Sequence, residues 1–134
     1  MKVIFVDYSE SFYLTGTSSN SADKVTGKFV QVKNDAIEYL IFSPKELTPY
    51  HADIVQRFCS EMGIYGVYVD ASKRFDIHNP GWIVIGGGRF EIDKERENIR
   101  LYDNSMAYGK FDTKGLKEKI CSIDKFKDFS LEIE

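Results

Sequence analysis

The 134-residue chain lacks the features that mark several large classes of protein. Its two cysteines are too few for a disulfide framework, and no apolar run is long enough for a signal peptide or a membrane span. The 18 basic residues are outnumbered by 21 acidic ones, so the charge balance does not favour binding to nucleic acid or to an anionic membrane. We therefore expect a cytoplasmic protein that binds neither.

Signatures of several phosphate and metal chemistries are also missing. Neither Cys59 nor Cys121 has an arginine six residues later, as the cysteine-dependent phosphatase loop requires. The glycines at 86–88 are not followed by Gly-Lys-Ser/Thr and lack the dinucleotide-binding spacing. His51 and Asp53 are two residues apart in a predicted helix, so their side chains point to different sides and do not suit a shared metal ion. We expect neither a metal nor another cofactor.

The chain is long enough to fold as one domain over residues 1–134. A chain of this length buries about two-thirds of the surface that it exposes when unfolded. No internal repeat, linker or low-complexity tract divides the sequence. We therefore expect a single domain, and we expect it to be a monomer.

Runs and alternations of β-branched and aromatic residues predict mostly strands, with two helices. The expected strands lie at 2–8, 28–33, 36–42, 66–70, 82–85, 89–92, 99–102 and 128–133, and the expected helices at about 49–62 and 113–121. Segments 16–24 and 71–81 are rich in polar and turn-forming residues and are expected to be loops. We predict an α+β fold, a mixed sheet of about six strands with two helices packed on its faces.

The first predicted helix carries a histidine in its first turn. Thr48 suits the N-cap and Pro49 suits the first helical position. His51 stands three positions before the apolar Ile54, so it projects from the N-terminal end of the buried face. The positive end of the helix dipole favours a neutral imidazole near pH 7, which suits a general base. The alternative is a histidine that only completes the edge of the core.

Two further stretches have patterns that suit binding of an anion. Three glycines at 86–88 let another group approach the backbone closely or mark a bulge, and Arg89 directly after them could bind a planar oxyanion through two hydrogen bonds. The alternative is an arginine paired with a nearby carboxylate. Successive N–H groups in residues 105–109 could converge on an anion, and the alternative there is an ordinary loop.

Taken together, these stretches resemble those of a known family. The three motifs, in chain order, are Tyr50-His51-Ala52-Asp53-Ile54, Gly86-Gly87-Gly88-Arg89 and Ser105-Met106-Ala107-Tyr108-Gly109. In this order they resemble the protein phosphohistidine phosphatase family, also called Janus/Ocnus. Three motifs in order are far more specific than any one of them. The resemblance covers the chain from Ala36 to the C-terminus.

The resemblance implies a sheet between two helices and a metal-independent hydrolysis of phosphohistidine, in a protein or in a small phosphoramidate. It also implies that the histidine of the first motif is the base that activates water and that backbone N–H groups of the Ser-Met-Ala segment hold the phosphoryl oxygens. The tyrosine before the histidine and the arginine after the glycines match residues of the family's site. The site residues implied in this chain are His51, Arg89, Tyr50, Ser105, Met106 and Ala107.

One position departs from the family pattern. By simple alignment the family's phosphate-binding lysine falls on Glu38, a carboxylate that would repel a phosphoryl group about 4 Å away by roughly 1 to 4 kcal/mol, depending on the dielectric. Lys33 and Lys45 are the nearest substitutes, although neither is in register. Two functions follow. The first is a phosphohistidine phosphatase, and the second is a catalytically weak module that binds phosphoryl groups or acidic peptides.

Overall fold

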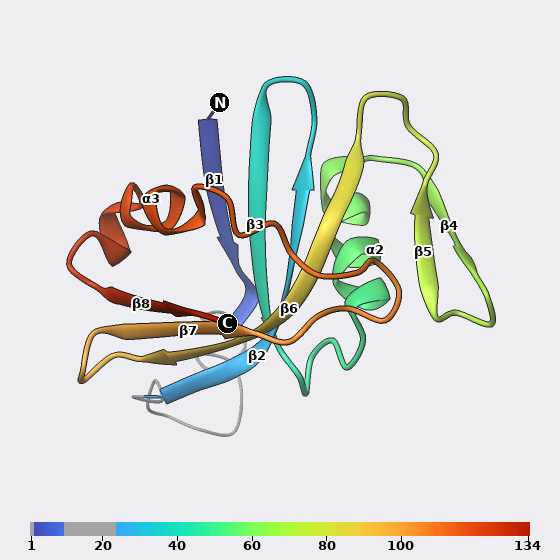
Figure 1. Cartoon of the computed structure of the whole chain (residues 1–134). Helices are drawn as coiled ribbons and strands as arrows, with labels where there is room; N and C mark the ends of the chain where they lie inside the picture. Colours follow the sequence, from blue (N-terminus) through green and yellow to red (C-terminus); the bar gives the residue numbers. More distant parts are fainter. Residues whose placement is uncertain (1, 10–23) are drawn as a thin grey trace.

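The computed structural model describes residues 2–9 and 24–134 (Figure 1). Its centre is a six-stranded mixed sheet in the order β1-β3-β2-β6-β7-β8. The six strands are β1 (Lys2–Asp7), β2 (Lys24–Lys33), β3 (Ile37–Pro44), β6 (Ile83–Asp93), β7 (Asn98–Tyr102) and β8 (Ser130–Ile133). The two outermost pairs are parallel, and the three inner pairs are antiparallel. The predicted loop at 16–24 falls almost wholly outside the described residues.

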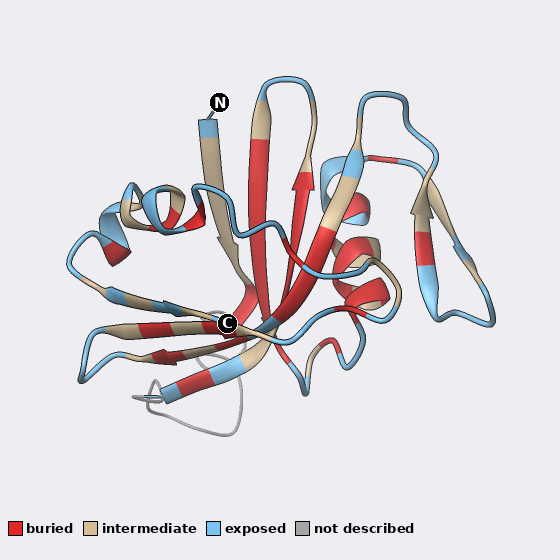
Figure 2. Ribbon diagram, in the orientation of Figure 1, coloured by how far each residue is buried: buried red, intermediate tan, exposed pale blue. Residues whose placement is uncertain are grey.

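Two helices cover opposite faces of this sheet, which confirms the predicted α+β architecture. Helix α2 (His51–Met62) packs on one face, and helix α3 (Leu116–Cys121) packs on the other together with the short helix η1 (Asp124–Phe126). Alternate residues of β3 serve the two faces, because Ile41 packs with the α2 cluster whereas Leu40 packs with the α3 cluster. The near-continuous apolar run at 36–42 is explained by this double burial (Figure 2).

The middle of β6 contains the three glycines, and the strand runs through them without interruption. The sequence predicted separate segments on either side of the glycines, but one strand spans Ile83–Asp93. A Cβ on Gly86 would lie 2.3 Å from the backbone oxygen of Lys110, and one on Gly88 would lie 2.7 Å from the ring of Phe111. Gly86 and Gly88 therefore allow the segment of Lys110 and Phe111 to pack closely against one face of the strand.

A two-stranded hairpin lies beside the main sheet. The sequence predicted its first strand, at 66–70, but predicted a loop in place of its second strand. Strand β4 (Gly66–Val69) pairs with β5 (Arg74–Ile77), which lies within the segment 71–81 that was expected to be irregular. Phe75 and Ile77 point toward the α2 core, and they alternate with the charged Arg74 and Asp76. This alternation extends over only four residues. The surrounding residues are mostly polar, and the prediction of a loop followed from their composition.

Both helices begin later than the sequence predicted. The N-cap of α2 is Tyr50 rather than Thr48, and its N–H donates to the Asp53 carboxylate at 3.3 Å. The Thr48 hydroxyl is instead buried in the preceding turn, where it donates to Ser43 Oγ at 2.5 Å. Helix α3 begins after Gly115, whose left-handed φ of 66° is incompatible with a helical turn. None of the described helices has the length and apolar character needed to cross a membrane.

Candidate active site

One cavity of about 300 Å³ gathers the three motifs that the sequence singled out. All six predicted site residues line it, namely Tyr50, His51, Arg89, Ser105, Met106 and Ala107. They come from the start of α2, the middle of β6 and the loop that follows β7. The structure adds Lys28, Lys73, Asp103 and Asn104 to the lining. Segments far apart in the chain therefore meet at one edge of the α2 face.

His51 is buried at the first position of α2, and one hydrogen bond fixes its orientation. Its Nε2 atom lies 2.9 Å from the carbonyl oxygen of Gly88. Because a carbonyl oxygen only accepts hydrogen bonds, Nε2 must carry the proton. In the neutral ring the other nitrogen, Nδ1, is then left with a free lone pair. The imidazole is thus held as an acceptor for one further proton.

The glycine at position 87 makes room for this ring. A Cβ built on Gly87 would lie 2.8 Å from His51 Cδ2 and 2.7 Å from the backbone oxygen of Phe29. Any side chain there would push the imidazole away from the strand. The glycine run and the histidine motif, which looked independent in the sequence, are therefore parts of one packing arrangement.

The surroundings of His51 favour its neutral form. Burial is the largest influence and lowers the pKa of the imidazole, and the nearby charges of Lys28 and Arg89 lower the pKa further. The hydrogen bond to Gly88 and the negative charge of Asp103 oppose this shift but do not reverse it. The sequence argument rested on the helix dipole and reached the same direction. At neutral pH the ring is therefore available to take up a proton.

The loop after β7 is closed by hydrogen bonds that do not use the N–H groups of Met106 and Ala107. Ser105 N–H donates to Gly109 O at 3.1 Å, and Gly109 N–H donates back to Ser105 O at 2.8 Å. The hydroxyl of Ser105 accepts from Tyr108 N–H at 3.1 Å. Within the described residues, neither Met106 N–H nor Ala107 N–H donates a hydrogen bond. The hydrogen bonds of Ser105 thus close the loop. The N–H groups of Met106 and Ala107 could donate hydrogen bonds to a bound anion.

The hairpin β4–β5 braces this loop from outside. Arg74 Nη1 donates to Ala107 O at 2.9 Å. The Tyr108 hydroxyl accepts from Phe75 N–H at 2.9 Å and donates to Phe75 O at 2.6 Å. Three hydrogen bonds from β5 therefore hold the segment that carries the free N–H groups.

Three cationic side chains line the cavity, Lys28, Lys73 and Arg89, and sequence analysis found only Arg89. Arg89 forms an ion pair with Asp103, with Nε and Oδ2 3.2 Å apart, so the predicted pairing with a nearby carboxylate exists alongside its place in the cavity. Lys28 extends from β2, and its Nζ donates to Pro49 O at 2.7 Å. Burial, together with the charges of Arg89 and Lys45, lowers the pKa of Lys28.

The residue that breaks the family pattern is remote from this cavity. Glu38 is buried on the face of β3 that packs with Leu40 against α3, opposite to the face that carries His51. Its Oε1 accepts a hydrogen bond from Lys119 Nζ at 3.0 Å. The expectation that Glu38 occupies the position of the phosphate-binding lysine is therefore wrong.

The suggested substitutes for that lysine are also wrong, because neither Lys33 nor Lys45 is among the described residues that line the cavity. The lining lysine on the neighbouring strand is Lys28, which shares the α2 face with Val30 and Val32. The alternation of β2 was visible in the sequence, but both of its faces are buried. The pattern could not tell which face would meet the histidine.

The fold and the cavity define a small α+β protein whose site has the groups to bind an oxyanion beside a neutral histidine. A model of the Janus/Ocnus family (Ocnus) matches residues 22–130, and the chain belongs to this family. The match includes β2 and Lys28, which the three motifs alone did not reach. No curated protein matches the chain.

Proposed function

We propose that the protein is a phosphohistidine phosphatase that hydrolyses the P–N bond without a metal ion. The observation that carries this proposal is the fixed tautomer of His51, which leaves Nδ1 as a proton acceptor. The cavity around it is lined by three cations, and the N–H groups of Met106 and Ala107 have no partner among the described residues. Membership of the Janus/Ocnus family supports the choice of phosphohistidine as substrate. The substrate is a phosphohistidine-containing protein or a small phosphoramidate.

The proposed reaction is one in-line displacement at phosphorus. A water molecule attacks the phosphoryl group, and His51 Nδ1 takes up one of its protons as the P–O bond forms. The P–N bond breaks, the departing imidazole nitrogen receives a proton from solvent, and His51 releases to solvent the proton that it took up. The products are histidine and inorganic phosphate, and His51 returns to its neutral form.

The phosphoryl oxygens would be held by groups that are already in place. The N–H groups of Met106 and Ala107 supply hydrogen bonds, and Lys28 and Arg89 supply positive charge. Lys28 thereby takes the role that the family resemblance gives to a lysine. Tyr50 is largely exposed at the rim, where its ring centre lies 5.6 Å from Lys28 Nζ.

One observation favours a second candidate function, a catalytically weak module for phosphoryl groups or acidic peptides. Asp103 lines the same cavity and pairs with Arg89, so an incoming anion has to compete with a carboxylate for this arginine. Such competition weakens binding and disturbs the position of the phosphoryl group. A binding module tolerates that loss of position better than a catalyst does.

Phosphate release from phosphohistidine and from phospholysine, with and without a chelator, tests the proposal. We expect the wild type to release phosphate from phosphohistidine at the same rate in both conditions. The His51→Ala variant lacks the general base, so it should hydrolyse phosphohistidine about 100-fold to 10,000-fold more slowly than the wild type. Turnover by His51→Ala at the wild-type rate, or loss of activity in chelator with rescue by zinc or magnesium, would contradict the mechanism. An inactive wild type that binds inorganic phosphate would favour the binding module.

A further inference from the structure

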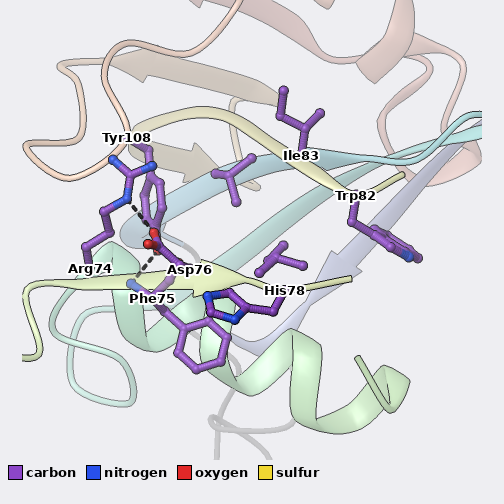
Figure 3. A pocket seen from close by; sticks show the side chains of 9 residues that line it. Arg74, Phe75, Asp76, His78, Trp82, Ile83 and Tyr108 are labelled. Atoms are coloured by element: carbon purple, nitrogen blue, oxygen red, sulfur yellow. Dashed lines mark hydrogen bonds and ion pairs between the residues drawn. The ribbon is translucent and has the colours of Figure 1, made fainter. Parts of the chain in front are cut away.

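A second cavity, of about 370 Å³, lies between β5 and the beginning of β6 (Figure 3). We call it the strand groove. Its apolar and aromatic lining consists of Phe75, Ile77, Trp82, Ile83, Val84 and Tyr108. Several of these side chains also pack on the α2 core, so the floor of the groove is part of the folded core.

One wall of the strand groove has an unpaired backbone residue. His78 N–H donates to Tyr65 O at 2.9 Å, so the even-numbered residues of β5 direct their backbone groups toward β4. The odd-numbered residues then direct theirs toward the groove, as the bonds between Phe75 and the Tyr108 hydroxyl confirm. In the described chain, the N–H and C=O of Ile77 have no hydrogen-bond partner.

The opposite wall is also a strand edge. Strand β6 pairs with β2 from its first residue, whereas its pairing with β7 begins only at Arg89. Before the bridge between Gly87 and Lys110, the described part of β6 has a strand partner on one side only. Two strand edges thus face each other across an apolar floor.

The strand groove adjoins the cavity that contains His51. Ala107 lines the His51 cavity, and the next residue, Tyr108, lines the strand groove. On β5 and the turn before it, Lys73 lines the first cavity and Arg74 lines the second. The two cavities therefore lie on either side of the contact between β5 and the loop after β7.

We propose that the strand groove binds the polypeptide on one side of the phosphohistidine as an added β-strand between β5 and β6. This inference rests on the proposed function, because it names a protein rather than a free phosphoramidate as the preferred substrate. The unpaired N–H and C=O of Ile77 match the backbone of an extended peptide, which presents both groups at every second residue. The apolar floor accepts alternate side chains of that peptide.

The test compares free phosphohistidine with a short peptide that carries phosphohistidine next to alternating valine and threonine residues. Two backbone hydrogen bonds of ordinary net strength should lower the KM of the peptide by about tenfold relative to the free amino acid. N-methylation of the peptide residue opposite Ile77 removes the N–H that bonds to Ile77 and should abolish this advantage.

A pair of variants separates the groove from general effects of charge. Ile83→Asp places a carboxylate at the groove on a side chain that is 54% exposed, so the core is spared. Met62→Asp adds the same charge at the end of α2, on a side chain that is 45% exposed and outside the lining of both cavities. Ile83→Asp should abolish the peptide advantage and leave free phosphohistidine unaffected, and Met62→Asp should change neither substrate. Equal kcat/KM for the two substrates on the wild type would overturn the inference, as would identical behaviour of the two variants.

If neither substrate is hydrolysed, the proposed function fails but the groove is still tested. Amide hydrogen exchange at Ile77 is then measured with the unphosphorylated peptide present. Slower exchange at Ile77, with no change at Val67 on the other strand of the hairpin, would support the added strand. Unchanged exchange at Ile77 with saturating peptide would overturn it.

Discussion

Replacing Gly87 by alanine tests whether the close packing of strand and imidazole is needed for activity. The added Cβ would lie 2.8 Å from His51 Cδ2, and ordinary contact begins at 3.4 Å, so the ring has to retreat by roughly 0.6 Å. Misplacement of a catalytic group by about 1 Å can cost about 100-fold in rate. We expect kcat for phosphohistidine to fall by about 10-fold to 100-fold in Gly87→Ala.

Gly66→Ala is the matched control for this prediction. Its Cβ would lie 2.5 Å from Asp76 O, an overlap similar to that of Gly87→Ala with Phe29 O, but it meets the Phe75 ring instead of His51 and lies outside the lining of the His51 cavity. Both variants should lose thermal stability, measured by circular dichroism, and only Gly87→Ala should lose kcat once the folded fraction is taken into account. Equal losses of kcat in the two variants, or full activity in Gly87→Ala, would refute the argument.

Three further substitutions test the charges in and around the cavity. Glu38→Lys would place a second ammonium group against that of Lys119, so it should lower the free energy of unfolding in urea by about 4 kcal/mol and should not raise turnover. Unchanged stability or faster turnover would contradict the assignment of Glu38 to the α3 face. Lys28→Ala removes a charged donor from the cavity and should lower kcat/KM by about 10-fold to 100-fold, with partial recovery in Lys28→Arg; wild-type kinetics would remove Lys28 from the site. Arg89→Lys should reduce kcat/KM nearly as much as Arg89→Ala, because lysine keeps the charge but not the planar fork; normal phosphate binding with lower thermal stability in both would make Arg89 structural.

Helix α2 and the main sheet could be predicted from the sequence because each is marked by a local pattern of apolar residues. The apolar periodicity after His51 gave α2, and the alternation of the chain gave the main sheet. The short strand β5 was missed because only four alternating residues mark it within a polar stretch. The N-cap was assigned to Thr48 because the hydroxyl looked available, whereas the folded chain uses it in the turn before the helix.

Site residues that lie within a contiguous sequence motif could be predicted. Site residues whose role depends on which face of a strand they occupy could not. The histidine, the arginine and the loop at 105–107 could be identified because each lies in a contiguous motif. The positions of Lys28 and Glu38 relative to the cavity depend on which face of β2 and of β3 meets α2. The sequence does not show this, because both faces of each strand are buried. The closed hydrogen bonding of Ser105 is likewise a property of loop geometry that the sequence does not contain.

The central claim is that neutral His51 accepts a proton during hydrolysis. The chain has only two histidines, so a His78→Gln variant assigns the ring signals of His51 in a nuclear magnetic resonance titration. The titration should give His51 a pKa below the ordinary 6.5, because burial disfavours the charged ring. A general base is active when unprotonated, so activity should be full above this pKa and fall as the pH drops through it.

The most direct measurement is the pH profile of kcat/KM for phosphohistidine, set beside that titration. The account predicts that kcat/KM declines by about tenfold per pH unit below the pKa of His51, with its midpoint at the titration midpoint. The residual activity of His51→Ala should lack this decline. A wild-type profile that stays flat while His51 becomes protonated, once spontaneous hydrolysis of the substrate is subtracted, would contradict the claim that His51 is the general base.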